Sequence, residues 1–118
     1  MRLSKKTIEK EKEKEVFKIF FQLIADIQTP QEAQEILTDL LTKTEMLMLA
    51  KRLAIFKALK EKVSYNEIKK NFEVSTATIS QFKNLAKRKG IISALKKIDS
   101  DQWAEKWATK IKNLFGQK

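Results

Sequence analysis

The chain has 118 residues, of which 42% are hydrophobic and 34% charged, and it carries a formal net charge of +10. One proline and two glycines are too few for the many tight turns of a sheet protein, and the abundance of Lys, Glu, Leu, Ile and Ala predicts an all-α fold. The absence of cysteine and histidine excludes disulfides and thiolate metal sites and removes the commonest general base, so we expect no enzyme activity, no metal site and no cofactor.

The positive charge is concentrated in the second half of the chain. Residues 1–50 carry eight basic and nine acidic side chains, residues 51–80 seven and three, and residues 81–118 ten and three. Such clustering favours a polyanionic partner, although a lysine-rich surface also serves solubility. No segment resembles a signal peptide or approaches the roughly 20 apolar residues of a membrane span, so we expect a soluble, cytoplasmic protein with no membrane partner.

A charged arm and an unusually apolar helix are expected at the N-terminal end. Residues 1–15 contain the alternating sequence EKEKEKE, which predicts a frayed arm or a solvated helix start, with an arm that contacts DNA as an alternative. Residues 16–27 are apolar around most of the helix circumference, whereas a surface helix of a small monomer needs only one apolar stripe. We therefore expect a second subunit to cover this helix, and residues 16–118 to form a single helical domain for DNA binding and dimerisation.

Three Ser/Thr-x-x-Glu patterns predict helix starts. In such a capping box, the hydroxyl and the carboxylate accept hydrogen bonds from backbone N–H groups at the helix start. The patterns begin at Thr29, Thr42 and Ser64, and Pro30 suits the first position of a helix. Met46 and Met48, after the second pattern, are interpreted as gap-filling residues of a core or interface.

The segment Ser64–Lys89 has the pattern of a helix-turn-helix. Ser75 is expected to cap its second helix. Two positions depart from the usual pattern: Lys69 stands where a small residue is common, and Glu73 stands where glycine often relieves a left-handed turn, at a cost of about 1 kcal/mol. The side chains expected to face inward and hold the two helices together are Ile68, Phe72, Val74, Ile79 and Phe82.

The exposed face of the second helix suits double-stranded DNA. The short side chains of Thr76, Ala77 and Ser80 would let the helix lie in a major groove, about 12 Å wide, against the base edges. Ser75 begins this helix, whose N-terminal N–H groups favour phosphates. Sequence-independent attraction to phosphates is expected from the flanking lysines, which are Lys69, Lys70, Lys83 and Lys87.

The C-terminal part is expected to contain one more helix. Gly90 follows a basic run and is predicted to end the preceding helix, with Ile91 and Ile92 packing beneath it. The last helix is predicted to begin at Asp99 or Ser100. Its apolar stripe, interpreted as core or subunit interface with a membrane-surface helix as an alternative, comprises Trp103, Trp107, Ile111, Leu114 and Phe115.

A longer segment around the helix-turn-helix points to a family. The sequence LLTKTEMLMLAKRLAIFKALKEKVSYNEI, residues 40–68, is followed by STATIS, residues 75–80. In these segments the chain resembles the Trp repressor superfamily, especially its YerC/YecD-type members. The resemblance implies an all-helical, intertwined homodimer that controls transcription as a repressor, with two recognition helices about one DNA turn apart. It places the family's DNA contacts at Asn66, Lys69, Thr76, Ala77, Thr78 and Ser80.

The tryptophan site of that family transfers poorly to this sequence. The family's repressor clamps the indole between two arginines beside a glycine. Arg52 matches the first arginine, but Gln81 replaces the second and Phe82 replaces the glycine. Phe82 would fill the space that the ligand needs, and one cation is lost. We therefore expect that tryptophan is not the corepressor and that Phe82 is a built-in plug that holds the recognition helix.

The leading interpretation is a dimeric, sequence-specific DNA-binding transcriptional regulator. One alternative is a nonspecific nucleic-acid or RNA binder that uses the same basic face. Another is a helical protein-interaction module. The sequence leaves open the operator, the controlled genes and the existence of an effector.

Overall fold

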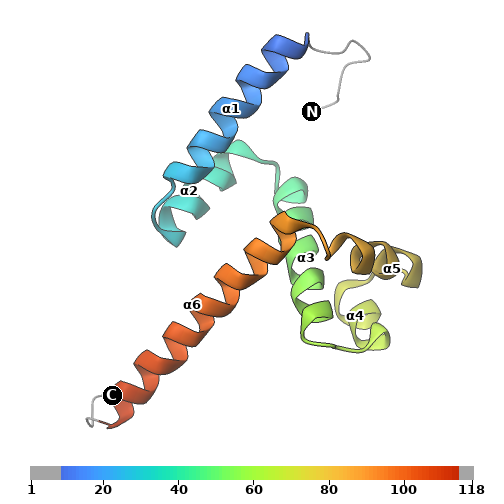
Figure 1. The fold of residues 1–118 in the computed structure, drawn as a ribbon, viewed down its shortest axis with the longest axis vertical. Helices are drawn as coiled ribbons and strands as arrows, with labels where there is room; N and C mark the ends of the chain where they lie inside the picture. The colour runs from blue at the N-terminus through green and yellow to red at the C-terminus, as the bar shows by residue number, and fades with distance from the viewer. Residues whose placement is uncertain (1–8, 115–118) are drawn as a thin grey trace. The chain divides into compact units, whose positions relative to one another are not determined.

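The computed structural model describes the backbone of residues 9–114 and the side chains of residues 9–102. Within this part all regular structure is helical, which confirms the predicted all-α class. The chain divides into two compact units, residues 1–46 and residues 47–118. The helices are α1 (Lys10–Asp26), α2 (Pro30–Leu40), α3 (Lys43–Lys60), α4 (Tyr65–Phe72), α5 (Thr76–Leu85) and α6 (Lys89–Leu114) (Figure 1).

Both predicted hydroxyl caps form in the first unit, which contains α1, α2 and the first turn of α3. The box at Thr29 is incomplete, because the Glu32 carboxylate accepts from the Gln28 N–H at 3.3 Å and not from the Thr29 N–H. The Thr29 hydroxyl accepts a hydrogen bond from the Glu32 N–H at 3.1 Å, and Pro30 occupies the start of α2. At α3 the box is reciprocal: Thr42 Oγ1 accepts from the Glu45 N–H at 3.1 Å, and Glu45 Oε1 accepts from the Thr42 N–H at 2.8 Å. The latter bond is the main reason why the pKa of the exposed Glu45 carboxyl lies below its ordinary range.

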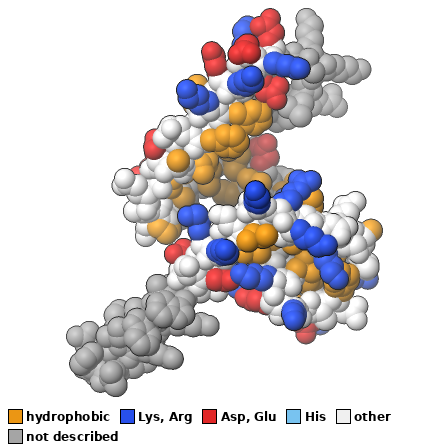
Figure 2. Space-filling model, viewed as in Figure 1, with side chains coloured by type: hydrophobic (Ala, Val, Ile, Leu, Met, Phe, Trp, Pro, Cys, Tyr) orange, Lys and Arg blue, Asp and Glu red, His pale blue; other side chains and the backbone are white. Residues whose placement is uncertain are grey.

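Helix α1 begins at Lys10, so the alternating charges from Lys10 to Glu15 form its first turns. They are solvent-exposed, as expected for a solvated helix start. None of the residues of α1 is buried. Hydrophobic side chains lie along the visible face of α1 in Figure 2. The large apolar residues that are exposed on this helix are Val16, Phe17, Ile19, Phe20, Phe21 and Ile24.

Helices α3 to α6 share one core in the second unit. The spacing of apolar residues along each helix places one stripe inward, and removal of these side chains from water is the main source of stability. Met48, in contrast, is exposed on α3. The buried core residues are Ile55 and Phe56 of α3, Ile68 of α4, Ile79 and Phe82 of α5, and Leu95 of α6.

The predicted boundary between α5 and α6 was wrong. Helix α5 ends at Leu85, and Gly90 lies in the first turn of α6 instead of ending a helix. A short connection closed by the Arg88 N–H donating to the Leu85 carbonyl at 3.0 Å redirects the chain. This turn brings Ile91 against the core, as predicted, whereas Ile92 remains exposed.

A helix start at Asp99 or Ser100 was also wrong, because α6 runs without interruption from Lys89 to Leu114. Leu95 and Ile98 continue its inward stripe, and no proline or glycine interrupts this region. Asp99 forms an ion pair with Lys60 of α3 instead of capping a helix. The predicted stripe from Trp103 to Phe115 lies outside the described side chains.

None of the described helices combines the length and the apolar content needed to cross a membrane.

Candidate nucleic-acid interface

Helices α4 and α5 form the predicted helix-turn-helix. The Ser64 hydroxyl accepts a hydrogen bond from the Glu67 N–H at 3.2 Å, and the Ser75 hydroxyl accepts one from the Thr78 N–H at 3.1 Å. Between the helices Glu73 adopts the left-handed conformation with φ 53° and ψ 51°. The turn is therefore the one that the sequence predicted, including the non-glycine residue in its strained position.

The recognition helix α5 is fixed from beneath by apolar contacts. Ile68 and Ile79 are completely buried, and Phe82 is 7% exposed. Phe72 and Val74 are half-buried and pack against the same core. Because these inward side chains pack both helices against the core, the orientation of the outward face of α5 is fixed.

Short polar and apolar side chains occupy that outward face. Thr76, Ala77 and Ser80 are exposed on α5, in the places that the helical spacing predicts. Thr78 is half-buried, and its hydroxyl oxygen lies 2.9 Å from that of Ser75. Three of the four predicted short residues therefore face solvent, while the Thr78 hydroxyl is partnered at the helix cap.

The predicted lysines and Asn66 lie on different elements of the motif and the chain that follows it. Asn66, Lys69 and Lys70 are exposed on α4. Lys83 is exposed near the end of α5, and Lys87 lies in the connection to α6. None of the ion pairs found among residues 9–102 involves these four lysines.

The residues that correspond to the tryptophan clamp are arranged around Phe82. Its ring stacks on Phe56 with a centroid separation of 5.0 Å and an interplanar angle of 18°. The Arg52 guanidinium carbon lies 4.9 Å from the centroid of the Phe82 ring. Gln81 is exposed on α5, next to Phe82 in the chain. Arg52 thus has an aromatic partner from its own chain, in a cation–π contact.

Sequence reasoning missed two features of this unit. One is the ion pair between Lys60 and Asp99, which joins α3 to α6. The other is a pocket that α3, α4, α5 and α6 line together. Both depend on residues more than 30 positions apart in the chain, so no local pattern reveals them. The described residues contain no acidic cluster suited to holding a metal ion.

The sequence model of the Trp repressor protein family matches residues 15–95, which include α4, α5 and most of α1. No curated protein and no solved structure matched the chain.

Proposed function

Because the chain belongs to the Trp repressor protein family, we propose that it represses transcription by inserting α5 into the DNA major groove in a sequence-specific manner. Family membership itself implies a non-enzymatic helix-turn-helix regulator that binds DNA.

The observation that carries the proposal is the outward face of α5. Thr76, Ala77 and Ser80 are short and exposed, and the helix beneath them is held by the buried Ile79 and Phe82. Short side chains allow close approach of the helix to base edges, where hydroxyls and a methyl group can distinguish base pairs. The positive end of the α5 helix and Ser75 at its cap favour the neighbouring phosphates.

Attraction to the DNA backbone is assigned to residues on both sides of this face. Lys69 and Lys70 of α4, Lys83 of α5 and the following Lys87 supply positive charge, and Asn66 can donate hydrogen bonds to a phosphate. These contacts position the protein without selecting a sequence. Each lysine that neutralises a phosphate adds about one to the slope of log affinity against log salt concentration.

We assign the exposed apolar side chains of α1 to the subunit interface of an intertwined homodimer. Six large apolar residues of this helix are exposed, among them Phe17 and Phe21, whose rings stack at 5.7 Å. Exposed apolar surface of this extent is typical of an interface. In such a dimer residues 16–118 would act as one domain, with the two α5 helices about one DNA turn apart.

Repression is proposed to work without tryptophan. Phe82 occupies the core between Phe56 and Arg52, and the clamp retains one arginine because Gln81 stands at the second position. Calorimetric titration with L-tryptophan should therefore give no binding in the micromolar range. Binding in that range would contradict this part of the proposal.

The DNA-binding mode is tested by selecting duplexes from a random pool and measuring affinity for a selected and a scrambled duplex. The selected duplex should keep its advantage as salt concentration rises, because base contacts do not depend on counterion release. Thr76→Glu should abolish specific binding while leaving the fold intact, since the residue is exposed and the new charge repels phosphate. Ser93→Glu, the same charge change on the exposed surface of α6, is the control. Equal affinity for both duplexes, or specific binding by Thr76→Glu, would contradict the proposal.

A further inference from the structure

We propose that the pocket lined by α3, α4, α5 and α6 binds a small organic acid with an apolar body, and that this acid weakens DNA binding. The binding site stands on its own geometry. The effect on DNA rests on the proposed function, because it requires α5 to contact DNA.

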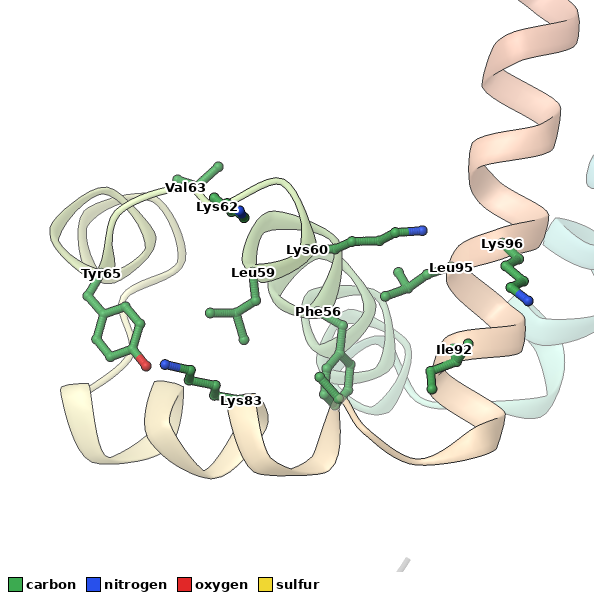
Figure 3. A pocket seen from close by; sticks show the side chains of 11 residues that line it. Phe56, Leu59, Lys60, Lys62, Val63, Tyr65, Lys83, Ile92, Leu95 and Lys96 are labelled. Carbon is green, nitrogen blue, oxygen red and sulfur yellow. The ribbon is translucent and has the colours of Figure 1, made fainter.

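The pocket has the size and the lining of a small-molecule site. Its volume is about 650 Å³, within the range of about 300–1,000 Å³ that is typical of such sites. In Figure 3, side chains from α3 and from α6 approach the same space. The apolar residues that line it are Phe56, Leu59, Val63, Ala86, Ile92 and Leu95.

The polar groups of the pocket select an anion. Lys60, Lys62, Lys83 and Lys96 line it together with Tyr65, and no carboxylate is among the lining residues. Lys60 is paired with Asp99. The other three lysines take part in none of the ion pairs of the described residues, so an anionic group of a ligand would meet cationic partners.

One of these lysines lines the pocket together with a hydrogen-bonding group. Figure 3 shows the Tyr65 hydroxyl of α4 pointing toward the Lys83 ammonium of α5. A carboxylate at this point could accept a hydrogen bond from each of them, while the apolar body lies against Leu59 and Phe56. This combination of an apolar wall and two converging donors favours an aromatic or branched carboxylic acid.

The pocket differs from the tryptophan-clamp region around Arg52 and Phe82. Arg52, Gln81 and Phe82 are not among its lining residues. Gln81 and Lys83 are two positions apart on a helix, which places them about 160° apart around its axis. Because Phe82 between them points into the core, the clamp residue Gln81 and the pocket residue Lys83 lie on opposite flanks of α5.

A ligand in this pocket would act on the DNA-binding face through Lys83. This side chain lines the pocket and stands at the edge of the exposed face that carries Ser80. A bound carboxylate that pairs with Lys83 would withdraw one cation from the DNA phosphates. The slope of log DNA affinity against log salt should then fall by about one.

Binding is tested without DNA by titrating the full chain with 2-naphthoate and, separately, with the neutral 2-naphthamide. Both are followed through the methyl NMR signals of Val63 and Leu95. We expect naphthoate to bind with submillimolar affinity and about tenfold more tightly than the amide, which corresponds to one charge-assisted hydrogen bond. Equal binding of both compounds, or no shift of these signals, would overturn the site.

Lysine variants then test which side chains make the pocket prefer the anionic naphthoate over the neutral naphthamide. Lys62→Gln and Lys83→Gln should each weaken naphthoate binding about fivefold and leave naphthamide binding unchanged. The control is Lys97→Gln, an exposed lysine of α6 that is not among the lining residues. If the variants bind naphthoate as well as the wild type, the anion assignment is wrong. If Lys62→Gln instead changes the monomer–dimer equilibrium, a second copy fills the pocket and the small-molecule assignment is overturned.

The regulatory effect is measured last, on a selected duplex at saturating naphthoate. A loss of DNA affinity that naphthamide does not cause supports regulation. Unchanged DNA affinity with naphthoate bound would overturn the regulatory part. Failure of the proposed DNA-binding mode is recognised separately, because the naphthoate titration and its variants contain no DNA.

Discussion

The replacement Phe82→Ala tests whether this side chain is a structural plug. Phe82 is 7% exposed, stacks on Phe56 and lies under the Arg52 guanidinium. Removal of a buried phenylalanine side chain costs about 3–5 kcal/mol. Within that total, the ring pair accounts for about 0.5–1.5 kcal/mol. The contact with the exposed Arg52 accounts for about 0.5–1 kcal/mol.

The loss in free energy of unfolding is measured by urea denaturation followed by far-UV circular dichroism. Wild type and variant are compared at one protein concentration, because the stability of a dimer depends on concentration. Domains of this kind have about 5–15 kcal/mol of stability in total, so Phe82→Ala should reduce the folded fraction substantially. Phe82→Leu serves as the matched variant, because it retains apolar volume and should cost only about 1–2 kcal/mol. A double-mutant cycle with Arg52→Gln isolates the cation–π contact. A cost below about 1 kcal/mol for Phe82→Ala, typical of surface positions, would refute the plug.

Two predictions concern the helix ends. Glu73→Gly should raise the free energy of unfolding by up to about 1 kcal/mol, because glycine adopts the left-handed conformation at φ 53° without a Cβ clash; a loss of stability in urea denaturation would show that Glu73 has a stabilising contact there. Glu45→Gln should destabilise the protein at neutral pH, where the ionised carboxylate accepts the Thr42 N–H. Since this bond lowers the pKa of Glu45 in the folded state, its stabilisation is present above the ordinary glutamate pKa and disappears as the pH falls through the folded-state value. The difference in unfolding free energy between wild type and variant should therefore shrink between neutral and acidic pH. A constant difference would contradict the assignment. The control is Glu35→Gln, the same change at an exposed position within α2.

The helix-turn-helix was predictable because its signals are local. Ser64 and Ser75 cap their helices through residues three positions away, and the inward stripe of α5 follows from helical spacing alone. The left-handed turn at Glu73 was also evident from its place in the motif. Burial of Ile79 and Phe82 follows from the same pattern.

The ends of α5 and α6 were not predicted, because a misleading local signal competed with tertiary packing. A basic run followed by Gly90 has the appearance of a helix end. The position does not require glycine, however, because a Cβ there would have no neighbouring atom within 4 Å. The better signal was the spacing of Ile91, Leu95 and Ile98, which is that of one helical face. Weighing that stripe above the glycine would have predicted a continuous α6.

The pocket could not be predicted, because its lining comes from four helices. Tyr65 and Lys83 belong to different helices, and each has an ordinary local interpretation as a first-turn residue and a surface cation. Their convergence depends on the crossing of α4 and α5. The sequence contained the residues of the site but no local evidence that they meet.

Placement of α5 in the major groove is tested most directly by cross-linking from a single position. The chain has no cysteine, so Ala77→Cys introduces a unique thiol on the exposed face of α5, which can be labelled with a photoactivatable azidophenacyl group. On irradiation with a selected duplex, this label should cross-link to bases at one position in each half-site, whereas the same label at Ser93→Cys on α6 should not cross-link to bases. Equal cross-linking from both positions, or none from Ala77→Cys on a duplex that is bound, would contradict the assignment of α5 as the recognition helix.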